Sequence, residues 1–119
     1  MDWKTFACKC CGKGEPNPVL KEKVEKLEVL LGEELICTCG TRCEKHNKEL
    51  QAAWDKGERK GLGQRPSDNS FHMRCMAVDF KVKRGTPNQW AMAANMIGFG
   101  GIHAYNTFCH VDVGPDRRW

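Results

Sequence analysis

Eight cysteines in a chain of 119 residues constrain this sequence more than any other feature. Six of them form two groups of three and the last two stand alone; in chain order they are Cys8, Cys10, Cys11, Cys37, Cys39, Cys43, Cys75 and Cys109. Residues 1–13 contain no apolar segment of the kind found in a secretory signal peptide. This setting favours thiols or metal ligands over a disulfide framework, with late release into an oxidising space as the alternative.

Length and charge indicate one compact domain, 1–119, in which residues 1–17 form a Cys-rich arm. No apolar stretch approaches the roughly 18 residues that a membrane-spanning helix needs, so we expect no membrane span. The net charge of +4 results from 19 basic and 15 acidic residues, and the basic residues form no stripe with interleaved aromatic residues. We therefore expect no nucleic-acid partner, and the oligomeric state stays open.

The first predicted helix covers residues 18–31. Asn17 is its N-cap, Pro18 occupies the first turn, and Gly32 supplies the stop. Its apolar stripe recurs at spacings of four, three and four residues: Leu20, Val24, Leu27 and Leu31.

A second helix begins at residues 86–89, where Thr-Pro-Asn-Gln matches a capping box, and ends at Gly98. The polar stretch 44–56 is compatible with a further helix. The Gly-, Pro- and Ser-rich residues 57–69 are predicted to form a loop.

Short strands are predicted at residues 34–38, 76–83, 102–105 and 108–113. The segment 76–83 alternates apolar and polar residues, which is typical of a strand with one buried face. Helices that are separated in sequence from a cluster of short strands indicate an α+β fold. We expect a small antiparallel sheet with helices packed on one face.

Imidazole and carboxylate groups recur at the predicted strands. His72 precedes Asp79 by seven residues as a loop enters a strand, while His110 and Asp112 alternate along the last strand and so point to the same face. Two histidines and one carboxylate with an open fourth position are a usual way to hold a catalytic zinc ion. The alternative is structural: a hydrogen-bonded histidine in a sheet and an aspartate that caps a strand.

Several motifs in order resemble the zinc D-Ala-D-Ala carboxypeptidase and murein endopeptidase family, whose fold is shared with the hedgehog signalling domain. The family pattern Ser-x-His-x-x-Gly-x-Ala-x-Asp is matched by Ser70, His72, Ala77 and Asp79. A Gly-rich turn at residues 100–101 precedes a His-x-Asp strand, and residues 41–47 are similar to the family's Ser-Gly-Tyr-Arg-Cys-Pro-x-His-Asn segment. The resemblance implies a hedgehog/DD-peptidase-like fold.

The same resemblance implies roles for individual residues. His72, Asp79 and His110 correspond to the ligands of one zinc ion. Arg42 corresponds to the cation that holds the substrate peptide, with Ser70 beside it. Peptidases of this sort use Arg because its planar fork suits a carboxylate or carbonyl oxygen.

The general base is the role that the resemblance leaves open, since many relatives place an acid a few residues before the last histidine and residues 104–109 contain none. Asp112 is the first candidate, because it lies two residues from a strand ligand on the same face; His103 is the second. Asp112 can instead fix the tautomer of His110. Cys75 stands where the family has Gly, which predicts a changed backbone conformation or a disulfide.

The expected function is a zinc metallopeptidase that hydrolyses D-amino-acid-containing peptide bonds of bacterial peptidoglycan. It would act as a D-Ala-D-Ala carboxypeptidase or as a murein endopeptidase, such as a phage-type lysin. We expect it to be made in the cytoplasm without a signal peptide and to act on the cell wall after release or lysis. The alternative is a non-catalytic zinc module in which the two cysteine groups hold one metal. Their spacings, C-x-C-C and C-x-C-x3-C, differ from the usual pairs of C-x2-C.

Overall fold

Local capping signals set the helix ends in the computed structural model, which describes residues 1–58 and 64–119. Part of the predicted loop 57–69 lies outside the described residues. The α-helices in these ranges are α1 (Pro18–Leu31), α2 (Glu44–Asp55) and α3 (Pro87–Ile97), and the 3₁₀ helices are η1 (Trp3–Phe6) and η2 (Phe71–Arg74). The strands are β1 (Ile36–Cys39), β2 (Ala77–Lys81), β3 (Gly101–Ala104), β4 (Cys109–Asp112) and β5 (Arg117–Arg118).

Both predicted helices are confirmed with their caps. The side chain of Asn17 accepts hydrogen bonds from backbone N–H groups of the first turn of α1, and Gly32 ends that helix in the left-handed conformation. Thr86 and Gln89 form the complete capping box of α3, and Gly98 ends it. The polar stretch 44–56 forms α2.

The five strands of the described chain form one sheet in the order β1-β2-β4-β3-β5. The pairs β1–β2, β2–β4 and β3–β4 are antiparallel, as expected, whereas β5 runs parallel to β3. The chain turns back after β4 and pairs on the far side of β3, so its direction matches that of β3. The α+β fold is confirmed, with a mixed sheet in place of a purely antiparallel one.

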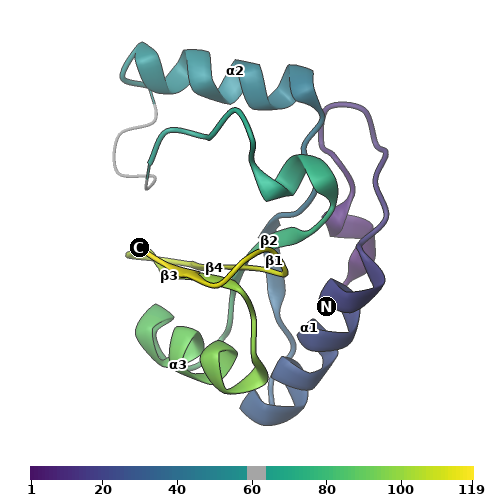
Figure 1. Ribbon diagram of the computed structural model, residues 1–119, viewed down its shortest axis with the longest axis vertical. Coiled ribbons are helices and arrows are strands. Elements are labelled where there is room, and N and C mark those ends of the chain that lie inside the picture. Colours follow the sequence, from purple (N-terminus) through teal and green to yellow (C-terminus); the bar gives the residue numbers. More distant parts are fainter. Residues whose placement is uncertain (59–63) are drawn as a thin grey trace.

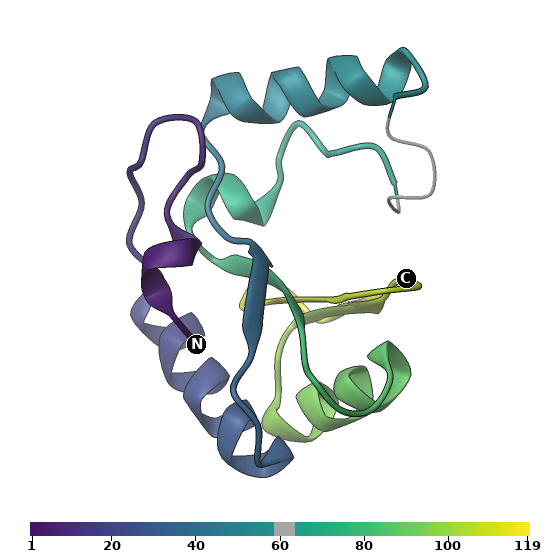
Figure 2. The same ribbon diagram turned by 180° about the vertical axis from the view of Figure 1, so that it is seen from behind.

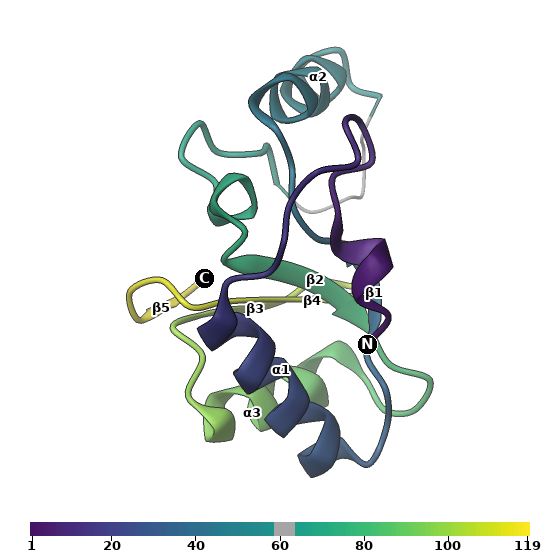
Figure 3. The ribbon, with the colours of Figure 1, turned by 90° about the vertical axis from the view of Figure 1, so that its right-hand side faces the viewer.

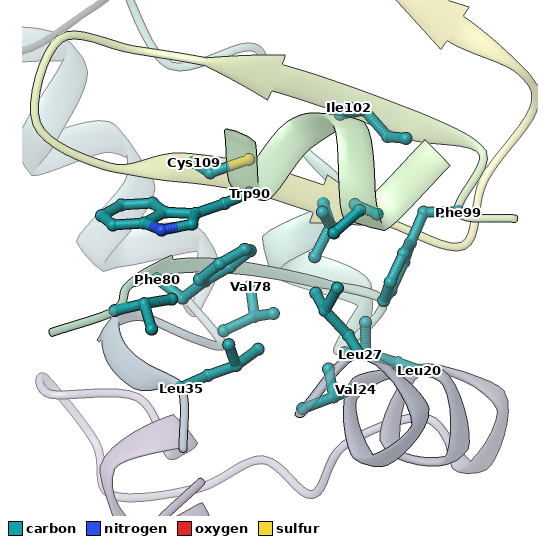
Figure 4. Packing of buried hydrophobic residues seen from close by; sticks show 14 of the residues in the cluster. Leu20, Val24, Leu27, Leu35, Val78, Phe80, Trp90, Phe99, Ile102 and Cys109 are labelled. Carbon is teal, nitrogen blue, oxygen red and sulfur yellow. The ribbon is translucent and has the colours of Figure 1, made fainter. Parts of the chain in front are cut away.

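Helices α1 and α3 cover one face of this sheet (Figures 1 and 3). Between them and the strands lies the main apolar core, in which Val78 and Phe80 of β2 meet the apolar sides of both helices (Figure 4). Alternation along the strands turns their neighbours toward the opposite face. The face away from α1 and α3 therefore carries Asp79, His110 and Asp112.

Helix α2 lies on that opposite side, beyond the segment that leads into η2 (Figure 2). Its buried residues are polar, Asn47 and Gln51. Asn47 donates to the backbone oxygen of Ser67 at 2.9 Å, and Gln51 donates to that of Pro66 at 2.9 Å and to Asp68 at 2.7 Å. The expectation of helices on one face thus holds for α1 and α3, while α2 is attached by hydrogen bonds rather than by the apolar core. None of the helices in the described residues has the length and apolar character of a membrane span.

Candidate active site

A cavity of about 510 Å³ opens on the sheet face away from α1 and α3. Among the described residues, the site residues expected from the sequence line this cavity, with the exception of His103. They are Arg42, Ser70, His72, Asp79, His110 and Asp112. Aromatic side chains contribute much of the remaining wall: Phe71, Tyr105, Phe108 and Trp119. The structure therefore brings the predicted metal ligands and the predicted substrate residues to one hollow.

Strand register and a short helix position the three predicted ligands. Asp79 of β2 lies directly opposite His110 of β4 in the antiparallel ladder. His72 lies in η2, which Ser70 caps by accepting a hydrogen bond from the His72 backbone N–H at 3.2 Å. Residues far apart in the sequence thus meet above the centre of the sheet.

Both imidazoles turn one nitrogen toward the same carboxylate oxygen. Nε2 of His72 lies 3.4 Å from Oδ1 of Asp79, and Nδ1 of His110 lies 2.9 Å from the same atom. The other nitrogen of each ring is held from behind: Nδ1 of His72 lies 2.6 Å from the backbone oxygen of Gly40, and Nε2 of His110 lies 2.7 Å from Oδ2 of Asp112. Each ring is therefore fixed at both ends.

These contacts test whether a metal ion fits. A backbone carbonyl only accepts, so Nδ1 of His72 carries the proton and Nε2 turns its lone pair toward Asp79. Asp112 can hold His110 in the matching tautomer, with the Nδ1 lone pair toward Asp79. Anchoring of the outer nitrogen is the arrangement found at metal-binding histidines. Two imidazole nitrogens and one carboxylate that converge in this way can hold a divalent cation such as zinc.

The carboxylates around the two imidazoles favour positive charge beside them. Burial alone would raise the pKa of Asp79, but His72 and His110 outweigh it and hold that pKa below its usual range. Burial lowers the pKa of His72, with Asp79 opposing only in part. His110 is buried as well, yet hydrogen bonds to Asp112 and Asp79 raise its pKa to about 9.

Asp112 is fully buried behind His110. Its Oδ1 accepts from the backbone N–H groups of Gly101 at 3.0 Å and Gly114 at 2.9 Å, while Oδ2 faces His110 and the Arg117 guanidinium. A Cβ at position 101 would lie 2.2 Å from Oδ2, so glycine is needed there. Because both oxygens are engaged on the side of His110 opposite Asp79, the contacts favour the orienting role of Asp112 over the role of general base.

His103 lies opposite His110 in the register of β3 and β4. Its ring stacks on Trp119 with centroids 5.3 Å apart and meets Tyr105 edge-on at 4.3 Å. Its Nδ1 contacts the backbone oxygen of Trp119. Among the residues that the structure describes, Tyr105 and Trp119 line the cavity and His103 does not.

The predicted substrate residues form a pair at the cavity wall. Nη2 of Arg42 donates to Oγ of Ser70 at 2.7 Å, and the arginine is only 8 % exposed. Its Nε is buried and has no hydrogen-bond partner within residues 1–58 and 64–119. A buried N–H donor at a cavity is suited to an oxygen of a bound ligand.

Sequence reasoning missed two neighbours of the site. Cys39 of β1 pairs with Asp79 in register, and its sulfur forms with His72 and Asp79 a group whose ligand atoms lie within 4.8 Å of one another. Burial raises the pKa of Cys39 to about 12, so this thiol stays protonated. The second neighbour is Arg117, which contacts Asp112 from the C-terminal strand β5. Both placements depend on strand order, which no local signal encodes.

Cys75 adopts a left-handed backbone conformation, which favours glycine. Its φ of 58° and ψ of 25° lie in the left-handed region, where it ends η2. Its thiol is free and accepts a hydrogen bond from Oγ1 of Thr41 at 2.8 Å. The expected disulfide at this position is wrong, and the expected change of backbone conformation relative to the family stays a prediction.

Comparison with known proteins finds similarity to a curated protein but to no family model. No protein-family model matches the chain. The chain is 29 % identical over 108 residues to a probable peptidoglycan L,D-endopeptidase, MepK, of Haemophilus influenzae. The aligned region covers 87 % of this chain and 53 % of the relative, so the chain spans about half the length of the curated protein that it resembles.

Proposed function

We propose that this chain is a zinc-dependent endopeptidase that cleaves peptide bonds of bacterial peptidoglycan. The observation that carries the proposal is the convergence of His72 and His110 on Asp79, with the outer nitrogen of each ring anchored, at a cavity that holds Arg42. The similarity to a probable peptidoglycan L,D-endopeptidase supports the substrate class and favours the endopeptidase over the D-Ala-D-Ala carboxypeptidase.

His72, Asp79 and His110 would hold the zinc ion, and we call these three residues the sheet site. A zinc ion with three protein ligands supplies Lewis acidity toward the scissile carbonyl and lowers the pKa of bound water. The backbone oxygen of Gly40 keeps His72 in the tautomer that ligation needs, and Asp112 does the same for His110. In this proposal Asp112 is a positioning residue.

Arg42 would bind the substrate peptide. Ser70 fixes one end of the guanidinium. Its Nε–H has no partner within the described residues and can donate to a carbonyl or carboxylate oxygen of the peptide. Arg65 and Arg117 add positive charge to the cavity lining. Such a lining suits the free carboxylates that peptidoglycan peptides carry.

Tyr105 is a proton donor available at the cavity. Its hydroxyl lies 3.4 Å from Nε1–H of Trp119 and accepts from it, so its own proton is free to point elsewhere. Burial raises the pKa of Tyr105, which keeps the phenol protonated. Tyr105 can therefore donate to an oxygen of the peptide, whereas His103 is engaged by Trp119.

Purified peptidoglycan tests the proposal. Incubation with the zinc-loaded protein should release fragments with new amino and carboxyl ends inside the peptides, read by mass spectrometry. Chelation and His72→Ala should each abolish their release. A D-Ala-D-Ala peptide in parallel identifies carboxypeptidase activity, because release of free D-Ala alone would contradict the endopeptidase. Fragments that persist in chelator would contradict the zinc mechanism.

A further inference from the structure

A second group of metal-ligand atoms lies where the N-terminal arm meets the start of α2, outside the sheet site. The sulfurs of Cys8, Cys11 and Cys43 all lie within 4.8 Å of one another. Nδ1 of His46 lies 3.8 Å from the sulfur of Cys8. Figures 1 and 2 show the arm reaching the first turn of α2, so two turns of the chain supply these atoms. We call the four residues the arm cluster.

The spacing within the arm cluster is that of a zinc site. Cys8 and Cys11 form a C-x2-C pair, and Cys43 and His46 form a C-x2-H pair. Cys10 stands inside the first pair, so that group reads as C-x-C-C in the sequence.

The alternative in which six cysteines share one metal is wrong. The sulfur of Cys37 lies 3.7 Å from the backbone oxygen of Thr5, to which it donates. Cys39 lies instead beside His72 and Asp79. The two cysteines of β1 therefore belong to other surroundings than the arm cluster.

Backbone amides around the arm cluster point at its sulfurs. Cys43 N–H donates to the sulfur of Cys8 at 3.3 Å, and His46 N–H donates to the sulfur of Cys43 at 3.4 Å. The turn after Cys8 is closed by Gly12 N–H, which donates to the Cys8 oxygen at 2.7 Å with a φ of +72° that favours glycine. Amides directed at sulfur stabilise the thiolate, the form that binds metals.

The charge state of Cys8 agrees with that geometry. Burial alone would raise its pKa, but backbone N–H groups of Cys43, Cys11 and Cys10, together with His46, lower it to about 6. Cys43 also stands at the N-cap of α2, where the helix dipole favours negative charge. A divalent metal ion would add positive charge beside these sulfurs and so favour their thiolate forms.

We propose that Cys8, Cys11, Cys43 and His46 bind a zinc ion of their own, separate from any ion at the sheet site. Three thiolates and one imidazole form a complete tetrahedral set, and soft sulfur ligands select zinc over magnesium or calcium. Four protein ligands leave no open position for substrate. The ion is therefore structural.

This ion would link the N-terminal arm to residues 40–43, which contribute to the candidate active site. Cys43 directly follows Arg42, and Gly40, whose oxygen holds His72, lies three residues before it. On the arm side, the backbone oxygen of Phe6 accepts from Thr41 N–H at 2.7 Å. Zinc binding would thus hold the arm against residues 40–43, although the ion itself contacts no substrate.

Metal content and cobalt spectra test the proposal, whether or not the protein cuts peptidoglycan. The reduced protein should bind two zinc ions, the double variant His72→Ala/His110→Ala one, and Cys11→Ser one. With cobalt in place of zinc, thiolate-to-metal charge-transfer absorption should persist in the double variant and vanish in Cys11→Ser. Cys37→Ser is the matched control and should keep both ions and the absorption. Retention of two zinc ions by Cys11→Ser, or wild-type protein without this absorption, would overturn the proposal.

The fourth ligand is tested by His46→Gln against Cys10→Ser. We expect His46→Gln to change the cobalt spectrum and to weaken zinc binding at the arm cluster by at least tenfold, and Cys10→Ser to change neither. The reverse result would show that Cys10, not His46, completes the set, and the assignment would be wrong. A Cys8–Cys11 disulfide in freshly purified protein, read as a loss of two mass units, would also overturn it.

Discussion

The sheet site and the arm cluster are two ways in which one small chain gathers ligand atoms. At the sheet site the proposed ligands come from a short helix and two core strands, and carbonyl and carboxylate groups hold the imidazoles from behind. In the arm cluster the proposed ligands come from two turns, and backbone amides orient the sulfurs. The sheet site opens into a cavity with three proposed ligands, whereas the arm cluster has four.

The two sites differ in how the rest of the fold holds their proposed ligands in place. Apolar packing against α1 and α3 fixes the strands beneath the sheet site, so its ligands are placed before any ion binds. The arm is irregular apart from η1, and α2 contributes polar buried residues. Phe6 anchors the arm in the apolar core, but the turn at residues 9–12 is exposed, and zinc would link that turn to the start of α2.

The largest expected effect separates the sites by activity. His72→Ala should lower peptidoglycan cleavage to background, a loss of more than ~10⁴-fold, because it removes the chemistry that the metal supplies. The charge-transfer absorption of the cobalt-loaded variant should stay, since the sulfurs are untouched. Cleavage rates and cobalt spectra measured on one preparation check both halves. Cleavage retained in this variant would contradict the assignment of the activity to the sheet site.

Stability gives the next largest effect and concerns the arm cluster. In the His72→Ala background, chelation should lower the free energy of unfolding by about 4 kcal/mol, the value for free zinc near a thousandfold above Kd. With Cys11→Ser added, chelation should have no effect. Denaturant unfolding with and without chelator measures the difference. Equal chelator sensitivity in both variants would show that the arm cluster contributes nothing to folding.

Asp112→Asn tests how the proposed ligands are oriented. Asp112 contacts His110 at the sheet site, as backbone amides contact the sulfurs in the arm cluster. If it orients His110, as its contacts favour, zinc affinity should fall by about 10–100-fold and saturating zinc should restore most activity. Activity and zinc affinity are measured over a range of free zinc. A variant that keeps its zinc but loses roughly 10²–10⁴-fold in turnover would instead identify Asp112 as the general base. His103→Ala is the control, and its inactivity would assign the base to that imidazole.

The smallest expected effect concerns substrate rather than metal. Arg42→Lys removes the Nε donor and the fork geometry, so kcat/KM should fall by about tenfold, the loss of one charged hydrogen bond. Zinc content of both sites should be unchanged, and most of the loss should appear in KM. The exposed Arg84→Lys is the matched control. A loss of zinc from the arm cluster would mean that Arg42 supports Cys43 rather than the peptide.

Local signals predicted the features that depend on local chemistry. Asn17, Gly32, Thr86 and Gly98 set helix ends through hydrogen bonds and backbone conformations within a turn, and those ends are confirmed. Alternation in β2 and β4 put the correct side chains on the face away from the core. The three residues of the sheet site were predicted as a set from the family resemblance, since His72 lies outside both strands, and their ligand role stays a prediction.

Features that depend on strand order were not predictable from one sequence. Cys39 reaches Asp79 because β1 pairs with β2, and Arg117 reaches Asp112 because β5 returns beside β3. His103 shares a sheet face with His110, yet Trp119 stacks on it. The arm cluster joins residues 35 positions apart in the chain, from Cys8 to Cys43. Spacing alone does not single out the pairs Cys8/Cys11 and Cys43/His46, because Cys10 stands inside the first, and it does not show that the pairs meet.

The polar attachment of α2 has a consequence for how the molecule unfolds. Asn47 and Gln51 hold this helix to residues 66–68 by hydrogen bonds, so its release exposes little apolar surface. The denaturant dependence and heat-capacity change of an unfolding step both scale with the surface exposed. Amide protons of α2 should therefore exchange with solvent through an opening that is nearly insensitive to denaturant, while those of α1 and α3 should require global unfolding.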